Sequence, residues 1–391
     1  MTKLKTIFFA ASALVLLGIS ACKDPSDGTG GNSADTSTPR YTVSFAVEGG
    51  NGTLKAEVDG VKINSGAQEE KDKMVIFTVE PDAGYVLEQW TNAGTVISEA
   101  GTKKTYTHTV TANMDIKVKF KEIPNGTAVL TLSPDKLDIK VKVITADGSP
   151  VTVEGCTVTT FTSGTKTTLH AKGTVVILKG KITELNCDSN NLTGLNVQGL
   201  TALQSLACNG NQLTALNVQG LTALQILDCL WNQLTALNVQ GLTALQRLAC
   251  YHNRLTALNV QGLTALQTLY CSENQLTALN VQSLTALQSL DCYNNQLTAL
   301  DVQGCTALQS LLCCNNRLTA DAFKKLFDDL PVRADSDNAW CVLYTEKTGV
   351  TEGNHTDFTV PSDLADAFNK AKTVKNWKMH KLNGSGNFSE I

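Results

Sequence analysis

The stretch Leu203-Gln204-Ser205-Leu206-Ala207-Cys208-Asn209-Gly210-Asn211-Gln212-Leu213 decides the fold, because it returns along the chain with a fixed period. Its cysteine recurs every 21 residues in seven copies, and so does its second asparagine. Self-similarity at a fixed period indicates a stack of equivalent units, each of which buries its apolar side on its neighbours. The seven cysteines are Cys187, Cys208, Cys229, Cys250, Cys271, Cys292 and Cys313.

The spacing of leucines and asparagine in each unit resembles the leucine-rich repeat, with cysteine in place of the third leucine, and the setting is similar to that of bacterial internalins. The resemblance implies a mainly β solenoid of seven 21-residue rungs over residues 181–318. It also implies a horseshoe whose parallel strands line the concave side.

The repeated cysteine lies two residues after an inward leucine on the same face of the strand, so we expect it to be a small buried apolar residue. A reduced ladder is favoured over disulfides, because stacked side chains point the same way and meet disulfide geometry poorly. A metal site is disfavoured, because no two ladder cysteines have CxxC spacing. The repeated asparagine is expected to satisfy buried backbone groups. The pairing of four further cysteines stays open: Cys156, Cys305, Cys314 and Cys341.

The N-terminus has the order of a secretory signal peptide over residues 1–21, with two lysines before an apolar stretch that is too short to span a membrane. Its end, Ile19-Ser20-Ala21-Cys22, resembles the bacterial lipobox, which implies lipidation of Cys22 and a lipid-anchored protein at the outer membrane or cell surface. Ordinary signal cleavage with an incidental Cys22 is the alternative. Residues 22–40 are polar and predict a flexible tether.

Residues 41–121 predict a small β module, since strand-like runs alternate with turns such as Gly49-Gly50-Asn51-Gly52. The pattern resembles the small β modules of bacterial surface proteins, including the B-repeats of internalins, and the resemblance implies a spacer. We interpret Trp90 and Tyr85 as core residues rather than as a sugar platform.

The solenoid needs a cover at each end, because an open rung exposes a strand edge. Residues 127–180 predict a β cap at the N-terminal end, and residues 319–391 predict an α/β cap at the other. In the second cap, apolar residues at helical spacing follow Asp321, which suits an N-cap, and another helix is expected from Asp363 to Lys372 with Ser362 as its cap. Trp377 and Met379 are expected to pack beneath this C-terminal cap.

Composition and motifs exclude several classes of function. The net charge of −4 disfavours a nucleic-acid partner, and the hydrophobic content of 42% excludes a disordered chain. The sequence contains no HExxH pair, GxSxG elbow, Walker loop or EF-hand loop, so we expect neither an enzyme nor a cofactor or metal site.

A candidate binding surface emerges from comparing the repeats with one another. The segment Leu-Thr-Ala-Leu-Asn-Val-Gln recurs almost unchanged, whereas the positions beside each cysteine vary. In a horseshoe these variable positions lie on or beside the concave sheet, and rigid aromatic residues there are typical of binding hot spots. Chance drift among duplicated repeats is the alternative. The expected aromatic patch comprises Leu230, Trp231, Tyr251, His252, Tyr270 and Tyr293, edged by Asp228, Glu273 and Asp291.

The leading hypothesis is a membrane-anchored recognition or adhesion protein that presents this concave face to a protein partner, such as a host surface protein. The alternatives are a glycan-binding or nutrient-capture surface lipoprotein, which would stack sugars on the same aromatic residues, and a structural envelope protein.

Overall fold

The computed structural model describes residues 38–82, 84–101, 103–124 and 126–391. The predicted signal peptide, Cys22 and most of the predicted tether lie outside the described residues. Within these ranges, no helix is long and apolar enough to cross a membrane. The strands form one set of sheets over residues 40–122 and another over residues 127–390.

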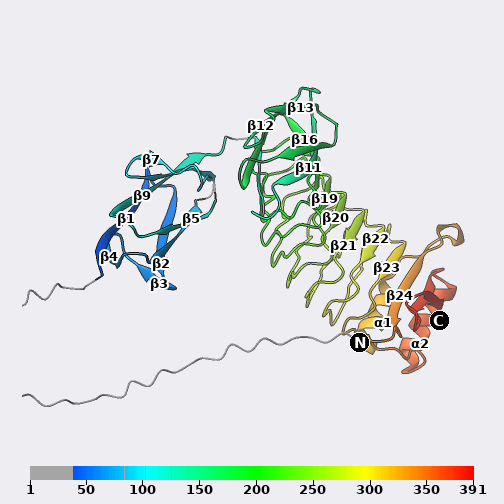
Figure 1. The fold of residues 1–391 in the computed structure, drawn as a ribbon. Coiled ribbons are helices and arrows are strands. Elements are labelled where there is room, and N and C mark those ends of the chain that lie inside the picture. Colours follow the sequence, from blue (N-terminus) through cyan, green and yellow to red (C-terminus); the bar gives the residue numbers. More distant parts are fainter. Residues whose placement is uncertain (1–37, 83, 102, 125) are drawn as a thin grey trace, which may run out of the picture. The chain divides into compact units, whose positions relative to one another are not determined.

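Residues 40–122 form two small sheets around one apolar core (Figure 1). Trp90 is fully buried in this core and its Nε1 donates a hydrogen bond to the carbonyl oxygen of Lys103 at 3.1 Å, which confirms it as a core residue. Tyr85 is half-buried. The sheet order is β4-β1-β9-β6-β7 and β3-β2-β5-β8. The strands are β1 (Arg40–Glu48), β2 (Gly52–Val58), β3 (Val61–Ile63), β4 (Ala67–Glu70), β5 (Met74–Pro81), β6 (Tyr85–Asn92), β7 (Thr95–Val96), β8 (Thr105–Thr109) and β9 (Met114–Glu122).

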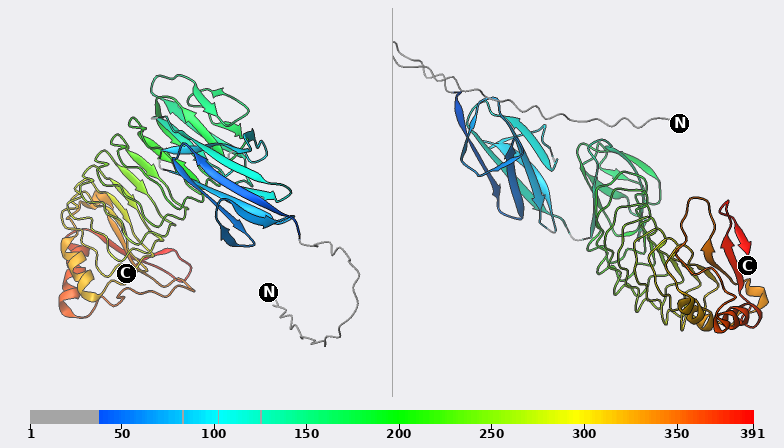
Figure 2. Two further views of the ribbon diagram at one scale, coloured as in Figure 1. Left: turned by 90° about the vertical axis from the view of Figure 1, so that its left-hand side faces the viewer. Right: turned by 90° about the horizontal axis from the view of Figure 1, so that it is seen from below.

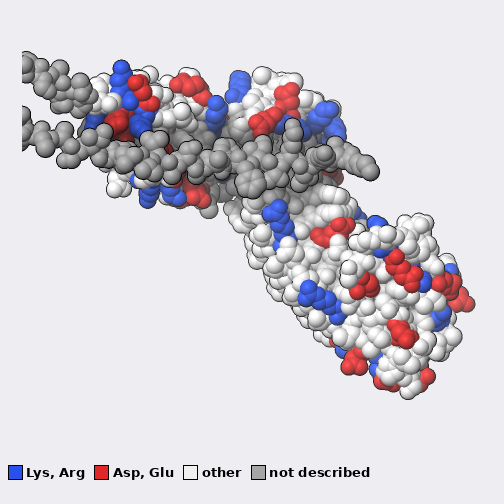
Figure 3. Space-filling model, turned by 60° about the horizontal axis from the view of Figure 1, so that its bottom comes forward, with Lys and Arg blue, Asp and Glu red and all other residues white. Residues whose placement is uncertain are grey.

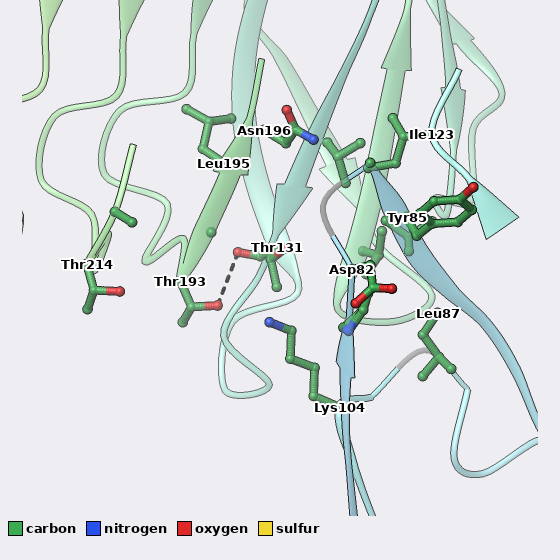
Figure 4. A pocket seen from close by; sticks show the side chains of 17 residues that line it. Asp82, Tyr85, Leu87, Lys104, Ile123, Thr131, Thr193, Leu195, Asn196 and Thr214 are labelled. Carbon is green, nitrogen blue, oxygen red and sulfur yellow. Dashed lines mark hydrogen bonds between the residues drawn. The ribbon is translucent and has the colours of Figure 1, made fainter. Parts of the chain in front are cut away.

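The N-terminal end of the solenoid is covered by strands that pair with the first rung. Strand β11 (Asp138–Thr145) lies antiparallel beside β16 (Ile182–Asn186), and β10 (Thr127–Thr131) lies antiparallel beside β17 (Gly194–Asn196). Figure 4 shows the side chain of Thr193 turned toward Thr131, whose carbonyl oxygen accepts its hydroxyl at 3.4 Å. These pairings remove the open strand edge. The cap also contains β12 (Val151–Glu154), β13 (Thr160–Phe161), β14 (Thr167–His170) and β15 (Val175–Lys179).

The repeats stack side by side, and each contributes one short parallel strand to a 12-stranded sheet (Figures 1 and 2). The register is constant, so that Leu206 pairs with Leu227 and Leu227 with Leu248. The fold is therefore the mainly β leucine-rich repeat solenoid that the period predicted. The rung strands after β16 are β18 (Ser205–Ala207), β19 (Ile226–Asp228), β20 (Arg247–Ala249), β21 (Thr268–Tyr270), β22 (Ser289–Asp291) and β23 (Ser310–Leu312).

The repeated leucines and cysteines form the solenoid interior. All seven ladder cysteines have 0% exposure, which confirms that they point inward. Burial raises the pKa of their thiols, for example Cys229 and Cys250, and keeps them protonated at neutral pH. Every cysteine among the described residues is a free thiol, including the four whose pairing the sequence left open.

The repeated asparagines form a second ladder that joins neighbouring rungs. In the Asn253 copy, the side-chain Oδ1 accepts the backbone N–H of Leu234 at 2.9 Å. Its Nδ2 donates to the carbonyl oxygens of Cys229 at 3.1 Å and Cys250 at 3.0 Å. One amide therefore satisfies buried backbone groups of two rungs, as the sequence predicted.

The sheet continues past the last repeat into the C-terminal cap. Strand β24 (Trp340–Thr345) lies parallel beside β23, followed by β25 (Lys378–Leu382) and β26 (Phe388–Glu390). Asn354 takes the place of a ladder asparagine, because its Oδ1 accepts the N–H of Leu318 at 2.9 Å and its Nδ2 donates to the carbonyl oxygen of Cys313 at 2.9 Å. The cap therefore supplies an additional rung that lacks the repeat sequence.

Two helices, α1 (Ala320–Asp329) and α2 (Ser362–Thr373), complete the cap, with a short 3-10 turn, η1 (Asp335–Asp337). The predicted N-caps were wrong. Thr319 caps α1, because its backbone is extended and its hydroxyl accepts the N–H of Ala322 at 3.2 Å, and Asp321 already lies inside the helix. Ser362 is the first residue of α2 and follows the N-cap Pro361. Trp377 and Met379 are buried, as predicted.

Candidate functional site

The outward side of the repeat sheet, together with the turns that follow its strands, carries the nine residues that the sequence singled out. In each three-residue strand the middle leucine points inward, so the first and third residues point outward, as does the residue after the cysteine. Trp231 is 53% exposed, and the other eight side chains are half-buried. We call this surface the sheet face.

One chain of contacts crosses four rungs of the sheet face. The ring of Trp231 stacks on that of His252, with centroids 3.6 Å apart. The Nε2 of His252 lies 2.8 Å from Oε2 of Glu273, and the hydroxyl of Tyr293 donates to Oε1 of the same carboxylate at 2.5 Å. Burial and the Glu273 carboxylate raise the pKa of the Tyr293 hydroxyl, so it stays a proton donor. We call these four residues the aromatic chain.

A second set of contacts involves a residue that the sequence reasoning missed. The Nε of Arg247 donates to Oδ1 of Asp228 at 2.9 Å, and its guanidinium carbon lies 5.2 Å from the ring centroid of Tyr270. Arg247 thus neutralises Asp228 and lies against an aromatic ring. Strand alternation could have identified it, because it occupies the first outward position of its strand.

The expected arrangement of the patch was therefore wrong in one respect. Asp228 and Glu273 do not edge a continuous aromatic surface; each is bonded to neighbours within it. Polar side chains pair across rungs because carboxylates that lose water on a packed surface need partners. Leu230 and Tyr251 are the other apolar members, and the ring of Tyr251 lies 5.9 Å from that of His252.

Three residues of the surface have a left-handed backbone. The second position after the ladder cysteine has φ between 51° and 61° in all seven rungs. Glycine and asparagine suit this conformation, whereas other residues lose about 1–2 kcal/mol there. Trp231, His252 and Glu273 occupy it nonetheless, and unfavourable backbone of this kind is typical of functional surfaces. The position is held in turn by Ser189, Gly210, Trp231, His252, Glu273, Asn294 and Asn315.

Asp291 is the carboxyl of the surface whose pKa departs clearly from its ordinary value. Burial raises its pKa to about 6, against the opposing effect of hydrogen bonds from Tyr293 and Ser272, and the nearby Glu273 carboxylate adds to the rise. Its charged form therefore lacks full solvation, and a cationic or hydrogen-bonding ligand group would restore it.

The sheet face ends against the C-terminal cap. A cavity of about 260 Å³ separates Tyr293 and Asn294 from Lys347 and Val350 of the cap. The Glu352 carboxylate ties the two parts together, since its Oε2 accepts the N–H of Asn315 at 2.9 Å and that of Thr345 at 2.6 Å. The cap thus contributes side chains to this end of the surface.

Over the face shown in Figure 3, charged side chains are sparse along the solenoid. The repeated segment explains this, because it contains no charged residue. In the part of the chain that the structure describes, no group of three or more His, Cys, Asp or Glu side chains is placed to hold a metal ion. The chemistry available on the sheet face is therefore stacking, hydrogen bonding and ion pairing.

Comparison with known proteins gives two family matches. Residues 41–124 match the divergent InlB B-repeat domain, and residues 264–304 match two copies of the leucine-rich repeat. Among curated proteins no match is found.

Among the solved structures that are similar over part of the chain are the following two. One is the functional domain of InlJ from Listeria monocytogenes, which includes a cysteine ladder, with 33% sequence identity and a TM-score of 0.33. The other is a leucine-rich repeat protein of Leptospira interrogans, with 27% identity and a TM-score of 0.28. The alignments cover 41% and 34% of this chain, and 39% and 42% of the respective solved chains.

The chain contains leucine-rich repeats. More particularly, it joins a divergent InlB B-repeat domain to a leucine-rich repeat solenoid with a cysteine ladder. This combination indicates a bacterial surface protein.

Proposed function

We propose that the protein is a surface adhesion or recognition protein that binds a protein partner through the sheet face. The supporting observation is that the aromatic chain is assembled from four successive rungs, whereas the rest of each rung repeats almost unchanged. Rigid aromatic groups braced by hydrogen bonds lose little conformational freedom on binding, which is why such groups serve as hot spots.

The proposal includes an orientation and an anchor. Lipidation of Cys22 would hold the chain at the outer membrane or cell surface, with residues 22–40 as a tether and the B-repeat domain as a spacer. A partner such as a host surface protein would then meet the solenoid outside the cell. The lipobox-like residues before Cys22 support this part.

The partner-binding surface can be tested with two double variants. Tyr251→Ala with Tyr270→Ala removes two outward rings. Truncation of hot-spot residues to alanine weakens binding by about 2 kcal/mol or more, which is roughly 30-fold in affinity. Gln219→Ala with Gln240→Ala changes exposed residues of the repeated segment and is the control. Each protein is used to capture surface proteins from epithelial cells, and the affinity for the captured protein is then measured.

We expect the control to bind like the parent and the Tyr251/Tyr270 variant to lose the captured protein. Equal capture by all three proteins would contradict a binding role for the outward rings of Tyr251 and Tyr270.

The anchor is tested by Cys22→Ala. We expect the variant to leave the membrane fraction or to accumulate as an unprocessed precursor, because acyl chains anchor by burying methylene groups at about 0.8 kcal/mol each. Detergent partitioning and precursor processing like those of the parent would contradict lipidation.

A further inference from the structure

A groove of about 470 Å³ runs beside the sheet face, along the turns that follow the strands. Trp231, His252 and Glu273 of the left-handed position contribute to its lining. Arg254, Gln275 and Asn294 supply polar groups to the same groove. The groove thus combines one large aromatic ring with several hydrogen-bonding groups.

The aromatic wall of the groove is rigid. His252 covers one face of the Trp231 indole at 3.6 Å, and Glu273 holds His252 in turn. Because Trp231 is still 53% exposed, its exposure falls on the uncovered face and the ring edge. Such a surface can stack on a flat apolar patch of a ligand without reorganising.

Some polar groups of the groove already have hydrogen-bond or ion-pair partners, and others do not. Both Glu273 oxygens have partners, in His252 and Tyr293. The side chains of Arg254 and Gln275 are exposed, and no hydrogen bond or ion pair involves them among the described residues. Arg254 is therefore available to an anion, and its planar guanidinium is suited to a carboxylate.

Arg254 also differs from the residue that most other rungs carry at the equivalent position. The equivalent position is glutamine in four other rungs, at Gln212, Gln233, Gln275 and Gln296, and arginine again only at Arg317. The change to arginine thus falls in the rung that carries His252, next to the rung of Trp231. Four residues that depart from the repeat consequently line one groove: Trp231, His252, Arg254 and Glu273.

We propose that this groove binds a pyranose sugar that carries a carboxylate, as uronic acids and sialic acids do. The apolar face of the sugar ring stacks on the open face of Trp231, the guanidinium of Arg254 pairs with the carboxylate, and the amides of Gln275 and Asn294 bond ring hydroxyls. The groove shares Trp231, His252 and Glu273 with the proposed protein interface. Arg254 belongs to the groove alone, and Tyr251 and Tyr270 belong to the protein interface alone, so variants at these residues let each proposal fail without the other.

The test titrates the purified full chain with methyl glucuronide and, separately, with the methyl glycoside of N-acetylneuraminic acid. Binding is followed by tryptophan fluorescence and by saturation-transfer NMR. Trp231 is a suitable reporter, because Trp90 and Trp377 are buried and Trp340 is half-buried. We expect millimolar affinity for at least one acidic sugar, and the better ligand identifies the source of the carboxylate. Methyl glucoside, which lacks the carboxylate, should bind about tenfold more weakly.

The variants use residues that other rungs already carry, so that the fold is kept. Arg254→Gln should bind the acidic sugar only as weakly as the neutral one, and Trp231→Asn should lose both. Arg317→Gln, the same change three rungs away, should bind like the parent. The Tyr251/Tyr270 variant should keep sugar binding even if it loses the protein partner.

Absence of binding for both acidic sugars would overturn the proposal, as would equal binding by Arg254→Gln and the parent. Equally strong binding of N-acetylglutamate amide, which has a carboxylate but no sugar ring, would also overturn it and would indicate an acidic peptide instead.

Discussion

Asp291 shows how burial on the sheet face makes a single residue sensitive to pH. Its pKa is about 6 in the folded chain and has an ordinary value of 3.8. The folded chain therefore binds this proton more tightly than the unfolded chain, and stability falls as the pH rises from about 4 through about 6. The difference corresponds to about 3 kcal/mol, which contact with solvent reduces to about 1–2 kcal/mol.

Asp291→Asn should remove this dependence. We expect the variant to match the parent at pH 4 and to be more stable by about 1–2 kcal/mol at pH 8. Urea unfolding between these pH values measures the effect, and Asp335→Asn, at an exposed carboxyl of the cap, is the control. If the free energies of unfolding of variant and parent differed by the same amount at all pH values, lost contacts rather than the bound proton would be the cause.

The positions of the candidate residues followed from the sequence, but their contacts did not. Strand alternation and the fixed period are sufficient to place Tyr251 and Tyr270 on the outward side. Trp231 lies in the turn after its strand, where alternation no longer applies. The stacking of Trp231 on His252 depends on a left-handed turn and on side-chain rotamers. The glycine at Gly210 and the asparagines at equivalent positions did carry a signal for that turn.

At the scale of elements, the asparagine ladder joins the rungs more specifically than apolar contact does. Asn253→Ala would leave the buried N–H of Leu234 without its partner. The carbonyl oxygens of Cys229 and Cys250 would each lose one of two asparagine donors. We expect a loss of about 2 kcal/mol in the free energy of unfolding, because one unsatisfied buried group costs about 1–3 kcal/mol.

Asn259→Ala is the matched control, because Asn259 is exposed. Among the described residues, its Oδ1 accepts only the N–H of Gln261, at 3.0 Å, two residues along the chain. Its loss should stay below about 1 kcal/mol. Chemical denaturation of both variants measures the difference, and similar losses would mean that the ladder adds nothing to rung packing.

The caps were predicted less completely than the rungs for a physical reason. The helices follow from apolar residues at helical spacing, but the additional rung does not repeat. Asn354 follows Asn316 by 38 residues instead of 21, since helix α1 and the turn after it intervene. Only the three-dimensional contacts to Leu318 and Cys313 show that it continues the ladder.

At the scale of the whole molecule, the fold class was predictable because seven copies of one unit leave a single way to stack. Each rung contacts its two neighbours, so the interior of one rung predicts that of the next. The two ends depend on sequences that occur once. Their general role as covers follows from the open strand edge, whereas their strand pairing does not.

The constant register of the rung strands also determines how the solenoid would respond to tension. Backbone hydrogen bonds between neighbouring parallel strands point along the stack, so a pull between its two ends loads every rung boundary in series. A rung that detaches gives up about 5 Å of stack. It releases 21 residues, or about 70 Å of extended chain. In the adhesion role proposed above, each detached rung would lengthen the link between the cell and its partner by the same amount, and each step would lower the force on that partner.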